Sequence, residues 1–233
     1  MPTIDLRRAG PTEAAWAAVC DRLQPFALPR CGRMVVISPH PDDETLGCGG
    51  LIATSAARGL PVSVVSVTRG EAAADRPDLA GVRSRELGAA LRCLDPTGTI
   101  GCRQLGFADG RVSDDVAALT AVIEDEIDEH DLIVCPLSDD GHPDHDAVSR
   151  ASTLAAARVG AAVRWFPVWA WHCHDPRRSI IGTGERFDLD VAARRKKRLA
   201  VECFGSQLDG LDPVVPDWML VRLCRSFEVL VTP

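Results

Sequence analysis

Short apolar runs alternate along the chain with longer segments whose apolar residues recur at helical spacing. The runs predict β-strands at residues 33–38, 61–68, 99–105, 131–135, 163–171 and 226–231. The intervening segments predict helices at residues 12–24, 45–58, 83–94, 116–127, 145–159 and 191–204. The early strands are apolar throughout, without alternation of apolar and polar positions, which is typical of parallel strands covered on both faces.

This order of elements predicts an α/β fold that is Rossmann-like, with a mostly parallel sheet and helices on both faces. The 233 residues are enough to bury a substantial core, and no segment has the composition of an interdomain linker. We therefore expect a single domain over residues 1–233, in which residues 1–30 form an N-terminal helical extension. Ligands of such folds bind outside the carboxyl ends of the strands, near the point where the strand order reverses.

Composition narrows the range of functions. The net charge is −7 and the pI about 5.4, which argues against a nucleic-acid partner because phosphate contacts need a basic surface. No apolar stretch approaches the roughly 20 residues of a membrane span, and the N-terminus has no apolar signal core. Nine cysteines without a CxxC pair favour reduced, buried thiols over a disulfide framework. We expect a cytoplasmic protein with no membrane partner.

Two clusters of residues that commonly bind metals follow predicted strands. The first is PHPDDE at residues 39–44, directly after the strand at 33–38. The second is GHPDH at residues 141–145, a short loop after the strand at 131–135. Because both lie at the carboxyl ends of predicted parallel strands, we expect them to meet at one edge of the sheet. Together they offer histidines and carboxylates, which are the usual ligands of a catalytic zinc site.

Spacing within the first cluster indicates different tasks for its residues. His40 and Asp43 stand three residues apart where the chain enters a helix, so they share a face and can bind one ion. Asp42 projects differently and is free to act as a base toward a water molecule. The alternative is that each cluster is only a loop, in which Asp42 or Asp43 caps the following helix. Glu44 has no clear task beyond the first turn of that helix or the support of a ligand.

These motifs resemble those of the LmbE-like (PIG-L) family of zinc-dependent N-deacetylases, which remove acetyl groups from N-acetylglucosamine-containing substrates. The sequence PHPDDETLGCGG begins at residue 39, and HPDH at residues 142–145 completes the pair. Three further segments fit the same family: TRGE at 68–71, RxxEL at 83–87, and a K…SQ segment at 197–207. The resemblance covers most of residues 33–207. One departure is Phe204, where family members often have a histidine two residues before the SQ pair.

The resemblance implies a metal centre built from both clusters. Its ligands would be His40, Asp43 and His145, and Asp144 would orient His142 or one of the ligands. Zn2+ is the expected cofactor, although the same mixed set of ligands also suits Fe2+ or Co2+.

The resemblance also implies the reaction, in which a metal-activated water attacks an amide carbonyl. Asp42 would be the base, and His142 would be the charged or donating group that stabilises the oxyanion and protonates the leaving amine. Arg69 would contact the substrate. The implied activity is that of a metal-dependent hydrolase that removes an N-acetyl or other N-acyl group from a small molecule containing an amino sugar.

Two other functions fit the same sequence. One is an amidase that cleaves a larger sugar–thiol conjugate, which would differ only in the shape of its substrate pocket. The other is a non-catalytic carbohydrate-binding module on a Rossmann-like scaffold, which would not need a spare base such as Asp42. The expected partner is therefore a small N-acetylated amino sugar or glycoside, and a homo-oligomer is compatible with the sequence.

Two further stretches have an unusual composition. The predicted strand at 163–171 contains Trp165, Trp169 and Trp171, which would share one side and form either core packing or an aromatic wall for a sugar. His172 and His174 follow with a single acid, which is too sparse a set for a second metal. Five consecutive cations at residues 194–198 resemble a nucleic-acid patch, but the acidic total favours a solvated helix face.

Overall fold

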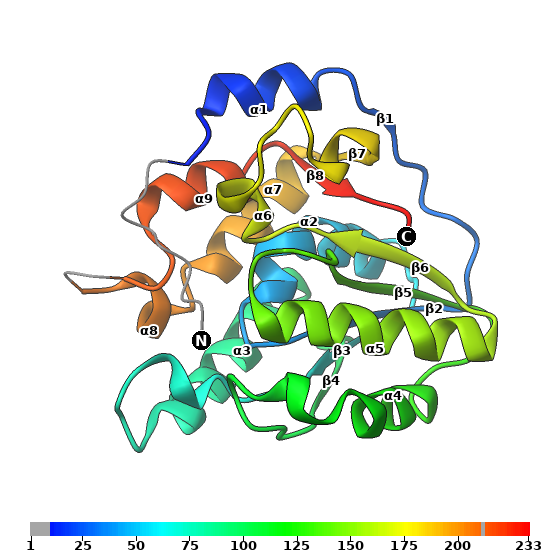
Figure 1. Ribbon diagram of the computed structural model, residues 1–233, viewed down its shortest axis with the longest axis vertical. Helices are drawn as coiled ribbons and strands as arrows, with labels where there is room; N and C mark the ends of the chain where they lie inside the picture. The colour runs from blue at the N-terminus through cyan, green and yellow to red at the C-terminus, as the bar shows by residue number, and fades with distance from the viewer. Residues whose placement is uncertain (1–9, 211–212) are drawn as a thin grey trace.

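The computed structural model describes residues 10–210 and 213–233, which contain a central five-stranded sheet (Figure 1). Every pairing in this sheet is parallel, and the strand order is β4-β3-β2-β5-β6. The strands are β2 (Arg33–Ser38), β3 (Val62–Ser66), β4 (Gly101–Gln104), β5 (Asp131–Pro136) and β6 (Ala162–Phe166). The chain runs outward from β2 to β4 and then returns to β5 on the other side of β2. The strand order therefore reverses between β2 and β5, which both histidine clusters follow.

Residues of β2 alternate between two hydrophobic cores, one on each face of the sheet. Met34 and Val36 belong to the larger core, whereas Val35 and Ile37 belong to the smaller one. None of these four side chains is more than 1% exposed. Burial on both faces explains why the strand is apolar at almost every position.

Helices cover both faces of the sheet, as the sequence predicts. Helices α2 (Asp43–Ala57), α3 (Leu79–Leu94) and α7 (Val191–Val201) pack on the larger core. Helices α4 (Val116–Glu124) and α5 (Pro143–Val159) lie side by side on the opposite face (Figure 1). The shorter helices are α1 (Glu13–Cys20), α6 (Ala170–Cys173), α8 (Gly205–Leu208), α9 (Asp217–Leu223), and the 3-10 turns η1 (Glu71–Ala73), η2 (Val112–Asp115) and η3 (Ile180–Thr183). The predicted α/β, Rossmann-like fold is thus confirmed.

The structure also contains a smaller sheet that the sequence does not predict as such. Its order is β1-β7-β8, and its strands are β1 (Gln24–Pro25), β7 (Glu185–Asp188) and β8 (Phe227–Leu230). Only β8 falls on a predicted strand. β1 and β7 span two and four residues, which is too short for a recognisable pattern of apolar and polar positions. A bridge between Trp165 and Val231 connects the end of this sheet to β6.

The predicted strand at 163–171 is wrong in its second half. β6 ends at Phe166, and residues Ala170–Cys173 form the short helix α6 instead. The cause is Asp140, a fully buried residue whose carboxylate accepts the backbone N–H groups of Val168, Trp169 and Ala170. A carboxylate distant in sequence therefore turns the chain where local composition favours extension.

Trp169 and Trp171 pack in the core, which is one of the two interpretations of the tryptophan-rich stretch. They are 8% and 4% exposed, respectively. The Trp171 ring packs edge-on against Trp16 of α1, with ring centroids 4.8 Å apart, and Trp16 Nε1 donates to the Trp171 carbonyl at 2.7 Å. Helix α1, which lies within the segment expected to form an N-terminal extension, packs on the core, and residues 1–9 of that segment lie outside the described part of the chain.

All nine cysteines are free thiols in the structure. Cys20, Cys48 and Cys135 are buried, but Cys102 and Cys173 are exposed, so burial does not describe the whole set. Within residues 10–210 and 213–233, no helix combines the length and apolar character needed to cross a bilayer.

Candidate metal centre

The two histidine clusters meet at the carboxyl edge of the main sheet. PHPDDE follows β2 and leads into α2, whereas GHPDH follows β5 and leads into α5. β2 and β5 pair in parallel register, from Arg33 opposite Asp131 to Val36 opposite Val134. Their carboxyl ends therefore lie next to each other, and the sheet brings the clusters together as expected.

His40, Asp43 and His145 form a compact group whose candidate ligand atoms all lie within 4.8 Å of one another. Oδ2 of Asp43 is 3.0 Å from Nδ1 of His40 and 3.3 Å from Nε2 of His145. The three residues are buried, at 9%, 3% and 0% exposure, respectively. The structure therefore brings together the three residues that the motifs mark as ligands.

Asp140 contacts His145 and was missed in the sequence. Its Oδ2 lies 2.8 Å from Nδ1 of His145, and both side chains are fully buried. The three backbone N–H groups that this carboxylate accepts set its position. A carboxylate against the second ring nitrogen is the usual way in which proteins orient a metal-binding histidine. Nε2 of His145 is left facing Asp43.

Two more carboxylates surround His40. Oδ1 of Asp109 lies 3.1 Å and Oδ2 of Asp144 lies 3.3 Å from Nε2 of His40. Asp144 also accepts two backbone N–H groups from the loop that precedes α4. Its side chain therefore contacts a candidate ligand, which is one of the two tasks expected of it, whereas Asp109 was missed. His40, His142 and Asp144 form a second group of ligand atoms within 4.8 Å.

The charges of this group suit a cation. Burial alone would lower the pKa of His145, but Asp43 and Asp140 outweigh that effect and raise it to about 9. Burial also opposes protonation of His40, yet hydrogen bonds to carboxylates, first of all Asp109, hold its pKa well above the ordinary value. Nε2 of His145 is buried and faces Oδ2 of Asp43 at 3.3 Å, and within the described part of the chain it makes no well-aligned hydrogen bond. Carboxylates that hold protons on two imidazoles can equally hold a divalent ion there, so these residues fit a metal.

Asp42 stands beside the ligand group in a strained conformation. Its φ of 142° and ψ of −34° lie outside the regions that L-residues normally occupy. Its Oδ1 lies 3.1 Å from Nη2 of Arg83, and both side chains are buried. Burial raises the pKa of Asp42 to about 7, against the opposing charge of Arg83. Asp42 occupies the N-cap position of α2, but its side chain makes no capping hydrogen bond, so the capping alternative does not describe its carboxylate.

Glu44 stabilises the PHPDDE turn through buried hydrogen bonds. Its carboxylate is fully buried and accepts the backbone N–H of Asp42 at 3.2 Å. It also accepts the hydroxyls of Ser38 at 3.3 Å and Thr45 at 2.7 Å. The task that the sequence left open for Glu44 is therefore to tie the strand end, the turn and the helix start to one another.

Arg83, the first residue of the RxxEL pattern, holds the same turn from another side. It donates to the carbonyl oxygens of Pro41 at 2.8 Å and Gly70 at 3.1 Å. Gly70 has a φ of 65°, and a Cβ there would lie 2.2 Å from the guanidinium. Glu86 of the same pattern accepts the N–H and the hydroxyl of Ser206, at 2.8 and 2.6 Å. The helix that carries RxxEL thus contacts the TRGE segment through Arg83 and the SQ segment through Glu86.

His142 is the N-cap of α5, and this contact determines which ring nitrogen can donate. Its Nδ1 accepts the backbone N–H of Asp144 at 3.2 Å, so a proton on the neutral ring sits on Nε2. Burial and the nearby charges of His145 and His40 lower the pKa of His142 to about 4. The ring centroids of those two histidines are 5.1 and 5.0 Å away. Of the two forms expected of His142, the neutral donor fits this environment.

Arg69 lies apart from the buried group. Its side chain is exposed and makes no hydrogen bond or ion pair with any residue that the structure describes. The hydroxyl of its neighbour Thr68 donates to the carbonyl of Pro39 at 2.9 Å, which places this loop against the PHPDDE turn. The expected contact of Arg69 with a substrate stays a prediction.

These features define an α/β protein with a candidate His–Asp–His metal centre at the reversal point of its sheet. A family model described as PIG-L: GlcNAc-PI de-N-acetylase matches residues 35–156, which include both histidine clusters. The chain belongs to the PIG-L family.

Proteins with similar sequences include several named as deacetylases. The chain is 35% identical over 169 residues to the 1D-myo-inositol 2-acetamido-2-deoxy-alpha-D-glucopyranoside deacetylase of Mycolicibacterium gilvum (strain PYR-GCK), covering 60% of this chain and 58% of that protein. It is 30% identical over 177 residues to the uncharacterized deacetylase YaiS of Escherichia coli (strain K12), covering 71% of this chain and 90% of that protein. The chain thus spans less than two thirds of the length of the mycolicibacterial relative.

A solved structure extends the similarity to the fold. The crystal structure of A40926 pseudoaglycone deacetylase Dbv21 superposes with a TM-score of 0.70 at 27% identity. The match covers 88% of this chain and 97% of that one, so the similarity of fold extends beyond the region of the motifs.

Proposed function

We propose that this protein is a metal-dependent N-deacetylase acting on a small molecule that contains N-acetylglucosamine. The observation that carries the proposal is the buried group of His40, Asp43 and His145 with the carboxylate of Asp42 beside it. Membership of the PIG-L family supports the reaction type. The name of the mycolicibacterial relative, which specifies a 2-acetamido-2-deoxy sugar, supports the substrate class.

His40, Asp43 and His145 would hold the metal, since two imidazoles and one carboxylate are a common set for a catalytic zinc. When bound, the ion would supply Lewis acidity to the reaction. Asp140 would keep the ring of His145 in its orientation. Zn2+ is the default cofactor, and Fe2+ and Co2+ suit the same ligands.

Asp42 would act as the general base. It would accept a proton from the attacking water while the new C–O bond forms at the amide carbon. Its ion pair with Arg83 and the hydrogen bonds of Glu44 to the turn would keep its carboxylate in one place. The accepted proton would then be available to the amide nitrogen as the C–N bond breaks. The products would be acetate and a free amino sugar.

His142 would stabilise the negative charge that develops on the carbonyl oxygen. Its Nδ1 is occupied by the backbone N–H of Asp144, so Nε2 would carry the proton that it donates. Arg69 would contact the acyl or sugar part of the substrate from its exposed position on the neighbouring loop.

The proposal is tested by measuring amine release from a panel of N-acetylglucosaminides and one larger N-acyl sugar–thiol conjugate. The protein is assayed as purified, after chelation, and after the addition of Zn2+, Fe2+ or Co2+ separately. We expect release of amine and acetate that chelation abolishes and at least one metal restores. Activity on the larger conjugate alone would correct the substrate class to that of an amidase. A protein that binds no divalent metal, or that binds it and releases no amine from the panel, would contradict the proposal.

A further inference from the structure

Helix α2 is broken at Cys48, close to its start. Cys48 has φ −142° and ψ 25°, which are not helical, and two helical segments meet there. The first segment, residues 43–47, carries the candidate ligand Asp43 and follows Asp42. A break in a helix leaves carbonyl oxygens unpaired before it and N–H groups unpaired after it. The direction of the first segment therefore depends on the groups that pair with these ends.

Lys197 and Glu228 supply the missing partners. Nζ of Lys197 donates to the carbonyl oxygen of Leu46, before the break, at 2.8 Å. The carboxylate of Glu228 accepts the N–H groups of Gly50 and Leu51, after the break, at 2.7 and 2.8 Å. In an unbroken helix the N–H of Gly50 would donate to that same carbonyl of Leu46. The two side chains thus occupy a gap in the hydrogen-bond ladder of α2.

The charges of the pair match the helix ends that they meet. The cation of Lys197 lies at the carboxyl end of the first segment, and the anion of Glu228 lies at the amino end of the second. The two groups also pair with each other at 2.7 Å, with side chains only 2% and 1% exposed. Moving an ion pair from water into the core costs free energy. The hydrogen bonds of Lys197 and Glu228 to the broken helix offset part of this cost.

Two glycines of α2, Gly47 and Gly50, allow neighbouring side chains to pack directly against the helix backbone at the break. A Cβ at Gly47 would lie 2.0 Å from the ring of Phe166, and a Cβ at Gly50 would lie 2.4 Å from Leu189. Any larger residue at either position would displace a fully or largely buried side chain. The first segment is therefore held by packing on β6 as well as by the ion pair.

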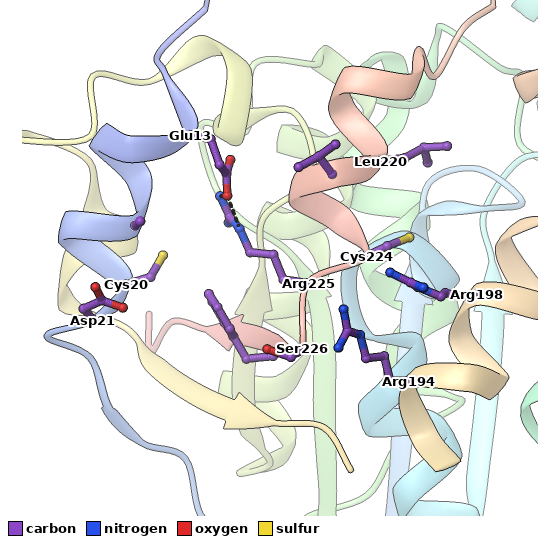
Figure 2. Close-up of a pocket in the computed structure, with 12 residues that line it drawn as sticks. Glu13, Cys20, Asp21, Arg194, Arg198, Leu220, Cys224, Arg225 and Ser226 are labelled. Carbon is purple, nitrogen blue, oxygen red and sulfur yellow. Dashed lines mark hydrogen bonds and ion pairs between the residues drawn. The ribbon is translucent and has the colours of Figure 1, made fainter. Parts of the chain in front are cut away.

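Lys197 differs from the other cations of its helix. Arg194 and Arg198 lie on the outer side of α7, where they line a surface cavity of about 420 Å³ together with Arg225 (Figure 2). Lys196 is half-buried and makes no hydrogen bond or ion pair within the described part of the chain. The three arginines of the run at 194–198 are thus exposed, Lys196 is partly exposed, and Lys197 is buried and points inward to α2.

We propose that Lys197 and Glu228 are positioning residues for the metal centre. By pairing with both ends of the break, they fix the direction of residues 43–47. They thereby fix the place of the ligand Asp43 and of the neighbouring base Asp42. The inference rests on the metal centre of the proposed function, but it does not depend on the identity of the substrate.

The test measures Co2+ binding to the metal-free protein through the visible absorption of the bound ion. The variants are Lys197→Met, Glu228→Gln and the double variant K197M/E228Q, which leaves no unpaired charge in the core. Lys196→Met is the matched control, since it removes the same charge from the adjacent position of the same helix. Thermal unfolding shows for each variant the temperature range in which it is folded, and Co2+ is titrated within that range.

We expect each folded variant of the pair to bind Co2+ at least about tenfold more weakly, with a changed absorption spectrum. Lys196→Met should retain the affinity of the natural protein within about twofold. Any folded member of the three that keeps the natural affinity and spectrum would overturn the inference. Because Co2+ binding needs no substrate, a natural protein that binds Co2+ but releases no amine would contradict only the proposed function.

Discussion

At the scale of single residues, the carboxylates of the candidate centre differ in what holds them. Asp43 lies between two imidazoles, at 3.0 and 3.3 Å, whereas Asp42 pairs with the guanidinium of Arg83 at 3.1 Å. Adjacent residues in the chain thus face different partners, and the strained backbone at Asp42 makes this divergence possible. A change at one of them should therefore leave the other in place.

Asp42→Ala should retain the metal and lose turnover. Removal of a general base typically lowers kcat by about 10²–10⁴-fold, while the three ligands remain. Metal content and kcat are measured on the same preparation. Asp43→Ala is the matched comparison, and we expect it to lose both metal and activity. An Asp42→Ala variant with activity near that of the natural protein would show that another group is the base.

Asp140→Asn should weaken metal binding although Asp140 is not itself a ligand. The amide has one carbonyl oxygen, so it cannot both accept all three N–H groups of the α6 turn and face Nδ1 of His145. We expect the metal affinity to fall by about 10–100-fold in a competition titration with a chelator. Asp139→Asn is the control, because its side chain is 94% exposed. Equal affinities of the two variants would rule out the role of Asp140.

The sequence predicts the site residues that lie inside motifs and misses those that only the tertiary structure brings close. The spacing of His40 and Asp43 marks them as candidate ligands, and the resemblance to the PIG-L family adds His145; the structure brings the three together. Asp109 belongs to no motif, and a loop carries it to His40. Asp140 directly precedes GHPDH, so its position in the sequence could have marked it as a candidate site residue. Its contacts with the turn before α6 could not be predicted, because that turn is distant in the sequence.

At the scale of elements, buried polar groups determine where helices and strands end. The prediction for β2 has the observed bounds, because its apolar run stops at Pro39. The prediction for β6 runs too far, since the carboxylate of Asp140 lies outside any local window. Helix α3 ends at Leu94, where Asp95 accepts the N–H groups of Thr97 at 3.0 Å and Thr99 at 2.7 Å.

Asp95→Asn should destabilise the protein near neutral pH more than in acid. Burial would raise the pKa of Asp95, but hydrogen bonds from Thr97 and Thr99 outweigh it and lower the pKa well below its ordinary value. The ionised form therefore contributes stability above the unfolded pKa of about 3.9, and this contribution is lost as the pH falls toward the folded pKa.

The change is measured as the free energy of unfolding in urea at pH 7 and pH 3. We expect Asp95→Asn to lose about 1–2 kcal/mol at pH 7 and less at pH 3. Asp75→Asn, at an exposed acid, is the control and should change little at either pH. A loss that is equal at the two pH values would contradict the contribution of the ionised carboxylate.

At the scale of the whole molecule, the candidate ligands come from two strand–helix units on opposite faces of the sheet. His40 and Asp43 belong to the turn and helix after β2, which pack on the larger core, whereas His145 belongs to α5 on the smaller core. One ion would therefore cross-link the two layers at the edge of the sheet. Unfolding would have to separate its ligands, so binding and global stability are linked.

Removal of the metal should lower the melting temperature of the whole protein. A ligand at about 100 times its Kd stabilises the folded state by about 2.7 kcal/mol. For a chain of this length, about 1 kcal/mol corresponds to about 2–4 °C, so we expect a decrease of about 5–10 °C after chelation. His145→Ala, which lacks a ligand from the second layer, should melt at the same temperature with and without added metal. A natural protein that gives up its metal to the chelator and melts unchanged would show that the ion does not join the two layers.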